Sequence, residues 1–457
     1  LKEQGLTAQQ IADALPQMQV ELVLTAHPTE AKRATVLAHH RRLFERFQAH
    51  QIDREGRDAD KSQQEENDFA VRALLAILWR TGEIYLDKPD IQSERRNVLD
   101  YLTQVFPSVL RPLDQRLRRA WIDVGLDPKV FDDPLVFPRL TFGTWVGGDR
   151  DGHPLVTADV TRESLIEMRR SALGLVQRQL LQLARLLSLS AYWQRPRPEF
   201  LQRLAAAADQ LGPAGRRAID RNPNEPWRQF INTMLARLPK SDLNGDRFTC
   251  EPTPVYQSAS ELLSDLRLLY DSLVASGQRR AADFAVQPLM RVVQTFGFHL
   301  AVLDIRQNSA FHDRAVEQLL VAAGFENTNF SQWSEEQRLE LLERELQSRR
   351  PFARPDVSLG TEADAVLSCY RVIKDYLKAY GEDGLGSLIV SMTRNVSDLL
   401  VVYLLAREVG LMEETTEGLR SPLAVVPLYE TVDDLERSPA IYDAFLRHPV
   451  TQRTLRG

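Results

Sequence analysis

Most of the chain has apolar residues at steps of three and four positions, which is the spacing of an amphipathic helix. The pattern predicts helices over residues 31–51, 64–84, 95–126, 161–187, 259–275 and 362–380. Two helix starts carry capping-box signatures, Ser258 with Glu261 and Asn395 with Asp398. Polar stretches rich in helix breakers predict loops at residues 53–66, 222–246 and 349–359. The chain is therefore predicted to be mainly helical.

Five short runs stand out from this background because they are almost continuously apolar and most are rich in β-branched residues. They lie near residues 20–26, 136–145, 299–306, 388–392 and 423–429. Buried parallel strands have this composition, and helical segments separate the runs. The sequence therefore predicts a β/α architecture with long helical insertions. Five strands would complete an open sheet, whereas a (β/α)₈ barrel needs eight, so the count leaves both folds open.

The composition is that of an ordinary soluble globular protein, with 43% hydrophobic and 26% charged residues. The 57 basic and 63 acidic residues are mixed along the chain, so we expect no nucleic-acid surface. The apolar run at residues 399–406 is far shorter than the roughly 20 residues that span a bilayer, and we expect no membrane segment. Cys250 and Cys369 lack metal-ligand spacing and fit a reducing cytoplasm.

The first apolar run is followed by His27 and Pro28. Proline suits the first turn of a helix, so His27 is expected beside the positive end of a helix, where a neutral imidazole faces an anionic ligand. A single histidine is more often a capping or packing residue. Thr25, Glu30 and Arg33 surround His27, however, and together they favour a functional role.

A glycine-rich loop follows the second run and contains Gly147 and Gly148. Glycines allow the backbone to approach an anion closely. Arg150 stands between Asp149 and Asp151, which predicts an arginine held in one orientation, as a clamp for carboxylate or phosphate requires. The alternative is a tight turn with a local ion pair, which is common for this composition.

Arg306 and Glu430 end the third and fifth runs. Because the carboxyl ends of parallel strands meet at one edge, both are expected on the same face as His27. Glu430 could cap the helix that follows. It could equally be a ligand of Mg²⁺, which proteins hold with one or two carboxylates plus water and substrate oxygens. His299 and His312 are expected to be structural or surface residues.

Taken in order, five segments resemble the phosphoenolpyruvate carboxylases of bacteria and plants. They are Val23-Leu24-Thr25-Ala26-His27-Pro28-Thr29-Glu30, Phe142-Gly143-Thr144-Trp145-Val146-Gly147-Gly148-Asp149-Arg150-Asp151-Gly152, Leu303-Asp304-Ile305-Arg306-Gln307, Ser391-Met392 with Ser397-Asp398, and Pro427-Leu428-Tyr429-Glu430-Thr431. The resemblance covers essentially all of residues 1–457 and identifies them as the N-terminal portion of one such catalytic domain. A chain that begins without Met, in a helical stretch, is expected to be a piece of a longer protein.

The resemblance implies a largely helical protein around an eight-stranded β/α barrel, with about five of the strands in this chain. It also implies a cytoplasmic homotetramer when full length. The implied reaction is anaplerotic carbon fixation, in which phosphoenolpyruvate and bicarbonate give oxaloacetate and phosphate through carboxyphosphate and the pyruvate enolate. The implied cofactor is Mg²⁺ or Mn²⁺, with no organic cofactor.

The same resemblance implies roles for individual residues. The catalytic residues would be His27, Arg150 and Arg306; the substrate-binding residues Trp145, Gly147, Gly148, Asp149, Asp151 and Gln307; and the metal ligand Glu430. In the family's pattern, the histidine serves carboxyphosphate and its decarboxylation, the strand-end arginine binds substrate phosphate, and the glycine-rich loop lines the pocket for bicarbonate and CO₂. Ala34 and His153 depart from that pattern and predict a divergent branch.

Two alternatives remain. Another barrel enzyme with an enolate intermediate would explain Glu430 and the arginines, but it would not explain His27 together with the glycine-rich loop. A non-catalytic half-length paralogue or fragment could act as a binding or assembly subunit. We expect the 457-residue chain to be inactive by itself, because the family's second metal aspartate would lie beyond Gly457.

Overall fold

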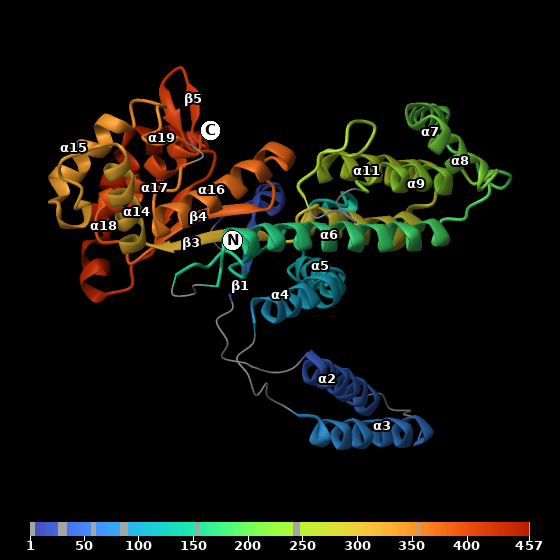
Figure 1. The fold of residues 1–457 in the computed structure, drawn as a ribbon. Helices are drawn as coiled ribbons and strands as arrows, with labels where there is room; N and C mark the ends of the chain where they lie inside the picture. The colour runs from blue at the N-terminus through green and yellow to red at the C-terminus, as the bar shows by residue number, and fades with distance from the viewer. Residues whose placement is uncertain are drawn as a thin grey trace. The chain divides into compact units, whose positions relative to one another are not determined.

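The computed structural model describes residues 5–25, 34–55, 61–82, 90–151, 155–240, 247–354 and 357–456. The chain divides into two compact units, one of residues 1–25 and 99–457 and the other of residues 26–98. Most described residues are helical, as the sequence predicted (Figure 1). Among the described helices, none combines the length and apolar character needed to cross a membrane.

The larger unit contains a parallel five-stranded sheet whose strands lie in sequence order. The strands are β1 (Gln19–Leu24), β2 (Arg139–Thr144), β3 (Val302–Asn308), β4 (Leu385–Ser391) and β7 (Val425–Pro427). Each overlaps one of the five predicted runs. An all-parallel sheet in sequence order is compatible with part of a β/α barrel. The sequence did not predict the antiparallel hairpin of β5 (Glu413–Thr415) and β6 (Gly418–Arg420).

Helices fill the connections between the strands, and further helices precede β1 and follow β7. Those before β2 are α1 (Ala8–Ala14), η1 (Leu15–Gln17), α2 (Ala34–Glu55), α3 (Lys61–Arg80), α4 (Ile91–Asp100), η2 (Tyr101–Val105), α5 (Phe106–Asp123) and η3 (Pro128–Asp132). Those between β2 and β3 are α6 (Ala158–Leu186), α7 (Pro198–Leu211), α8 (Pro213–Asp220), α9 (Pro226–Arg237), α11 (Ala259–Ala275), α12 (Arg279–Ala281), η4 (Ala282–Val286) and α13 (Gln287–Phe296). The rest are α14 (Ser309–Ala322), η5 (Phe330–Gln332), α15 (Glu335–Glu345), α16 (Thr361–Tyr380), α17 (Val396–Glu408), α18 (Val432–Arg447) and α19 (Pro449–Arg456).

The two faces of the sheet differ in polarity. On β2, the buried Phe142 stacks between Phe106 of α5 and Phe296 of α13, with ring centroids 4.5 and 5.4 Å away. Its neighbour Thr141 lies on the opposite face, because side chains alternate along a strand. There it accepts a hydrogen bond of 3.2 Å from Gln19 of β1. At β2, one face of the sheet is therefore fixed by aromatic packing against helices, and the other carries polar groups.

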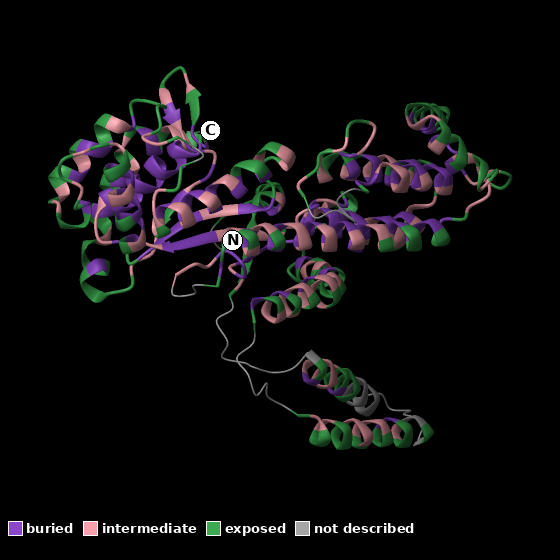
Figure 2. Cartoon of the chain, viewed as in Figure 1, coloured by how far each residue is buried: buried purple, intermediate pink, exposed green. Residues whose placement is uncertain are grey.

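The predicted loop over residues 222–246 is wrong where α9 lies. Pro226 occupies the first turn of this helix, a position that needs no backbone N–H donor, so here proline starts a helix. Trp227, Phe230 and Met234 follow at helical spacing, and they are buried in the core that α9 shares with α6, α11 and α13. In Figure 2, the buried positions of this core are purple along α6, α9 and α11.

The helices behind β3 and β4 are joined by a cluster of two arginines and two aspartates, which is buried except for the half-buried Arg394. Arg338 of α15 pairs with Asp313 of α14 and, at 3.1 Å, with Asp398 of α17. Arg394, which follows β4, contacts the same two carboxylates at 2.7 and 2.8 Å. Burial opposes ionisation of Asp398, but the hydrogen bond from Arg394 and the charges of Arg338 and Arg394 outweigh it, and the pKa of Asp398 is lowered.

The structure confirms one predicted capping box and not the other. Asn395 and Asp398 form the reciprocal pair at the start of α17. Ser258 is the N-cap residue of α11, but its hydroxyl contacts Ser260, and Glu261 accepts from the backbone of Gln257. Asp398 therefore both starts a helix and neutralises two arginines.

We expect Asp398→Asn to lower the free energy of unfolding by about 3–5 kcal/mol at pH 7, because it leaves the buried Arg338 and the half-buried Arg394 without a full counter-charge. Since the pKa of Asp398 is lower in the folded chain than its unfolded value of about 3.9, its contribution is present above that pH and is lost as the pH falls further. The difference from the unmodified chain should therefore shrink below about pH 4. Urea unfolding followed by circular dichroism at pH 7 and pH 3.5 measures it.

The matched control is Asp443→Asn on α18, which removes an exposed pair with Arg447. Its effect at pH 7 should stay within about 0.5 kcal/mol. Equal effects of the two substitutions would show that the buried cluster does not hold these helices together.

Candidate functional site

Side chains from three strand ends meet at Arg306 of β3. Its Nη2 lies 2.9 Å from Oδ2 of Asp151 and 3.0 Å from Oε1 of Glu430, and its Nη1 lies 3.4 Å from Oδ2 of Asp149. The Arg306 side chain is only 9% exposed. Arg306 and Glu430 therefore lie at one edge of the sheet, as expected for strand-end residues, and Asp149 and Asp151 join them there.

The glycine-rich loop after β2 continues the sheet alongside β3. The backbone N–H of Arg306 donates to the carbonyl of Gly148 at 3.0 Å, and that of Arg150 donates to the carbonyl of Arg306 at 2.9 Å. A Cβ atom on Gly148 would lie 2.0 Å from the carbonyl oxygen of Asp304. Gly147 has a φ of +90°, and a Cβ there would lie 2.0 Å from Oγ of Ser164 on α6. Both glycines are thus required by close contacts within the protein.

Trp145 lies beside Arg306 and connects it to an acid that the sequence analysis missed. The ring centroid of Trp145 is 5.4 Å from the guanidinium carbon of Arg306. Its Nε1 donates to Oδ2 of Asp304 at 3.1 Å, and the backbone of Ser387 donates to Oδ1 at 2.9 Å. Burial raises the pKa of Asp304 although both hydrogen bonds oppose the shift. Asp304 stands two residues before Arg306, on the same strand face, and this spacing could have identified it from the sequence.

The expectation that Asp149 and Asp151 orient Arg150 is wrong, because both carboxylates pair with Arg306. Arg150 instead lies near buried groups of the helical layer. The pKa of His312 on α14 is lowered to about 4, chiefly by burial; Asp398 opposes the shift, and the positive charge of Arg150 contributes to it. The Nε atom of Arg150 is buried and has no hydrogen-bond partner among the described residues.

Another predicted residue, Gln307, does not join the cluster around Arg306. Gln307 follows Arg306 directly, so its side chain points to the opposite face of the sheet. It is buried, and its Oε1 accepts from the backbone of Asn308 at 3.0 Å. His27 lies outside the described residues, as do Glu30 and Arg33. The segment leading to His27 is anchored, because Thr144 and Trp145 both donate to the carbonyl of Leu24, at 3.0 and 3.2 Å.

The described residues do not by themselves fit a complete site for Mg²⁺. In the described ranges, no three His, Cys, Asp or Glu residues are grouped so that they could hold a metal ion. Both oxygens of Glu430 are engaged, Oε1 by Arg306 and Oε2 by the backbone N–H of Met392 at 3.1 Å. Glu430 can therefore supply one carboxylate to a metal ion only by giving up its contact with Arg306 or with Met392.

Comparison with known proteins gives a match along the whole chain. The sequence model of the family described as phosphoenolpyruvate carboxylase matches residues 1–457. The phosphoenolpyruvate carboxylase of Nocardia farcinica is 34% identical over 461 residues, covering 98% of this chain and 47% of the relative. That of Aromatoleum aromaticum is 33% identical, with 97% and 47% covered, and phosphoenolpyruvate carboxylase 1 of Chlamydomonas reinhardtii is 33% identical, with 97% and 45% covered. The chain spans about half the length of these relatives.

We expect Gly148→Ala to destabilise the chain by about 1–3 kcal/mol, because the added methyl group would press against the backbone of β3. The matched control is Gly174→Ala within α6, where the nearest atom to a new Cβ is the flexible end of Arg178 at 3.5 Å. The control should be neutral or stabilising by roughly 0.5–1 kcal/mol, as expected for alanine within a helix. Urea unfolding measures the free energy of unfolding of both variants. A Gly148→Ala chain as stable as the Gly174→Ala control would contradict the close contact.

We expect the 457-residue chain to bind Mn²⁺ only weakly, with no affinity in the micromolar range. The described residues supply one candidate carboxylate, Glu430, and both its oxygens are engaged. A single carboxylate gives little to a hard cation that keeps most of its water. Titration calorimetry measures the affinity. Micromolar binding that disappears in Glu430→Gln would show that the chain holds a complete metal site.

Proposed function

Because the chain belongs to the phosphoenolpyruvate carboxylase family, we propose that the complete protein carboxylates phosphoenolpyruvate with bicarbonate to give oxaloacetate and phosphate. The observation that carries the proposal is the family match over residues 1–457. The cluster around Arg306 supports the proposal, because an arginine at a strand end suits a phosphate-bearing substrate. A different barrel enzyme acting on pyruvate is not favoured, since the match to one family spans the whole chain.

The proposed reaction has two steps. An oxygen of bicarbonate attacks the phosphorus, the bond between phosphorus and the enol oxygen breaks, and carboxyphosphate and the pyruvate enolate form. Carboxyphosphate then releases CO₂ and phosphate, and the enolate carbon bonds to CO₂ to give oxaloacetate. Both substrates are anions, so positive groups must offset their repulsion and stabilise the enolate as it forms.

In this proposal Arg306 binds the phosphate of the substrate. Three of its N–H groups bind Asp149, Asp151 and Glu430, and the phosphate is proposed to displace at least one of these carboxylates. Glu430 is the most exposed of the three, with 32% of its side chain accessible against 21% and 18%, and it is the carboxylate expected to move. Displacement makes substrate binding sensitive to these three acids as well as to Arg306.

The remaining roles rest on the family resemblance. His27 is proposed to serve carboxyphosphate and its decarboxylation, and Arg150 is proposed as a catalytic residue. Trp145, Gly147 and Gly148 are proposed to line the bicarbonate pocket, and Gln307 to contribute to substrate binding. Glu430 is proposed as one ligand of Mg²⁺ or Mn²⁺, which would supply positive charge when bound.

The family also suggests the assembly. The five-stranded sheet is proposed to be part of a (β/α)₈ barrel, which its strand order supports. The complete protein is proposed to be a cytoplasmic homotetramer.

The complete protein should form oxaloacetate from phosphoenolpyruvate in a reaction that depends on bicarbonate and on a divalent metal. An assay coupled to malate dehydrogenase measures it. His27→Asn should lower kcat by about 10²–10⁴-fold with a much smaller effect on KM, because the histidine is assigned to a step after binding.

A folded complete protein without bicarbonate-dependent oxaloacetate formation would rule out the proposed reaction and would favour a binding or assembly role. A His27→Asn variant with a raised KM and unchanged kcat would leave the reaction standing but make His27 a binding residue.

A further inference from the structure

Asp304 lies at a bulge between β3 and β4, two residues before Arg306. This one residue of β3 faces two residues of β4, Gly386 and Ser387, because the register of the two strands shifts there. The backbone N–H of Ser387 donates to Oδ1 of Asp304 at 2.9 Å. Bulges are common beside active sites, where they redirect a side chain. Here the bulge binds the Asp304 carboxylate to the backbone of β4.

The neighbouring backbone leaves Asp304 little freedom to move. A Cβ atom on Gly386 would lie 2.1 Å from Oδ1 of Asp304 and 2.9 Å from Cγ1 of Val302, so only glycine fits there while the carboxylate occupies this place. On the other side, the carbonyl oxygen of Asp304 lies 2.0 Å from the position that a Cβ atom on Gly148 would take. Both the carboxylate and the backbone of Asp304 are therefore confined by close contacts with adjacent segments.

The second oxygen of Asp304 sets the direction of the Trp145 ring. An indole has a single N–H donor, and that of Trp145 donates to Oδ2 of Asp304 at 3.1 Å. The guanidinium carbon of Arg306 lies 5.4 Å from the centroid of the same ring, within the range of cation–π attraction. The described ion pairs of Arg306 do not include Asp304. Asp304 therefore acts on Arg306 through the ring of Trp145 rather than through an ion pair.

We propose that Asp304 is a positioning residue of the carboxylation site, whose carboxylate holds the indole of Trp145 against Arg306. This inference rests on the proposed function, in which Trp145 lines the pocket where CO₂ meets the enolate. Without the hydrogen bond to Asp304 the indole can turn, and the pocket opens to water. The enolate carbon then takes a proton from water, leaving hydroxide, and pyruvate is released with CO₂ and phosphate in place of oxaloacetate and phosphate.

The first test is Asp304→Asn in the complete protein. An amide has one acceptor oxygen, so it cannot accept from both Ser387 and Trp145, and the backbone donor of Ser387 is the one fixed in place. The kcat for oxaloacetate should fall by about tenfold or more, the loss expected for one hydrogen bond to a charged group. The KM for phosphoenolpyruvate should change less, because Arg306 is retained, and the share of pyruvate among the products should rise.

A double variant separates positioning from a merely structural role. Trp145→Phe keeps an aromatic ring but has no N–H for Asp304 to hold. If Asp304 acts through Trp145, adding Asp304→Asn to Trp145→Phe should lower kcat little further, because the interaction is already lost. Losses that multiply in the double variant, or an unchanged pyruvate share in Asp304→Asn, would overturn the proposal.

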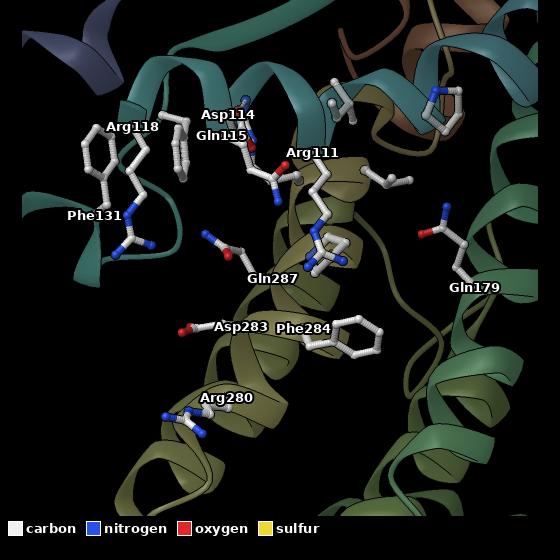
Figure 3. Close-up of a pocket in the computed structure, with 16 residues that line it drawn as sticks. Arg111, Asp114, Gln115, Arg118, Phe131, Gln179, Arg280, Asp283, Phe284 and Gln287 are labelled. Atoms are coloured by element: carbon white, nitrogen blue, oxygen red, sulfur yellow. Dashed lines mark hydrogen bonds and ion pairs between the residues drawn. The ribbon is translucent and has the colours of Figure 1, made fainter. Parts of the chain in front are cut away.

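The matched control is Asp114→Asn. Asp114 of α5 lines a cavity among α5, α6 and α13, and its carboxylate also accepts two hydrogen bonds, from Nε and Nη2 of Arg291 at 2.8 and 3.0 Å (Figure 3). The control should lower the free energy of unfolding but leave kcat and the pyruvate share unchanged. An equal rise of the pyruvate share in Asp114→Asn would reduce the effect to general destabilisation and overturn the positioning role.

Nuclear magnetic resonance of the 457-residue chain tests the contact without any activity. The indole N–H signal of Trp145 is the one that disappears in Trp145→Phe. In the unmodified chain its proton should exchange with water more slowly than that of Trp193, which is 93% exposed. In Asp304→Asn that signal and the Nε–H signal of Arg306 should both shift. Equally fast exchange, or unshifted signals in a folded Asp304→Asn chain, would overturn the positioning role. A complete protein that forms neither oxaloacetate nor pyruvate would instead rule out the proposed function.

Discussion

The arrangement of the candidate site depends on one guanidinium group, that of Arg306, which joins the ends of β2, β3 and β7 through Asp149, Asp151 and Glu430. Without it, three carboxylates would face one another in a largely buried position, which is costly for the folded state. The same donors are those that a substrate phosphate would use. If Arg306 binds the substrate phosphate as proposed, stability and substrate binding compete for one side chain, and the resting cluster must open at one acid. The greater exposure of Glu430 places that opening on the side of β7.

Arg306 can join the three strand ends because the strands and helices around it hold its backbone in place. Phe142 is clamped between helices on the apolar face of β2, and the loop after β2 is pressed so closely onto β3 that Gly148 leaves no room for a Cβ atom. Behind β3 and β4, the buried cluster around Asp398 ties three helices together. Apolar packing thus sets the position of the strands, and the charged clusters set the position of their ends.

The strand runs and the helical periods could be predicted from the sequence because burial imposes a period of two or 3.6 on apolar residues. The convergence of polar groups at one sheet edge followed from strand direction alone. The partner of Asp149 and Asp151 could not be predicted, since adjacency along the chain favoured Arg150 whereas the sheet register brings Arg306 closer. Pro226 shows the same limit, because proline both breaks helices and starts them, and only the buried face that follows it decides which.

At the carboxyl end of β2, Arg306 is enclosed by acids, so an anion that takes the place of one of them must first separate an existing ion pair. The cost of separating that pair is subtracted from the free energy of the new contact, which lowers the affinity for a simple anion. If Arg306 binds the substrate phosphate as proposed, the cluster accepts only ligands that make enough further contacts to offset this cost.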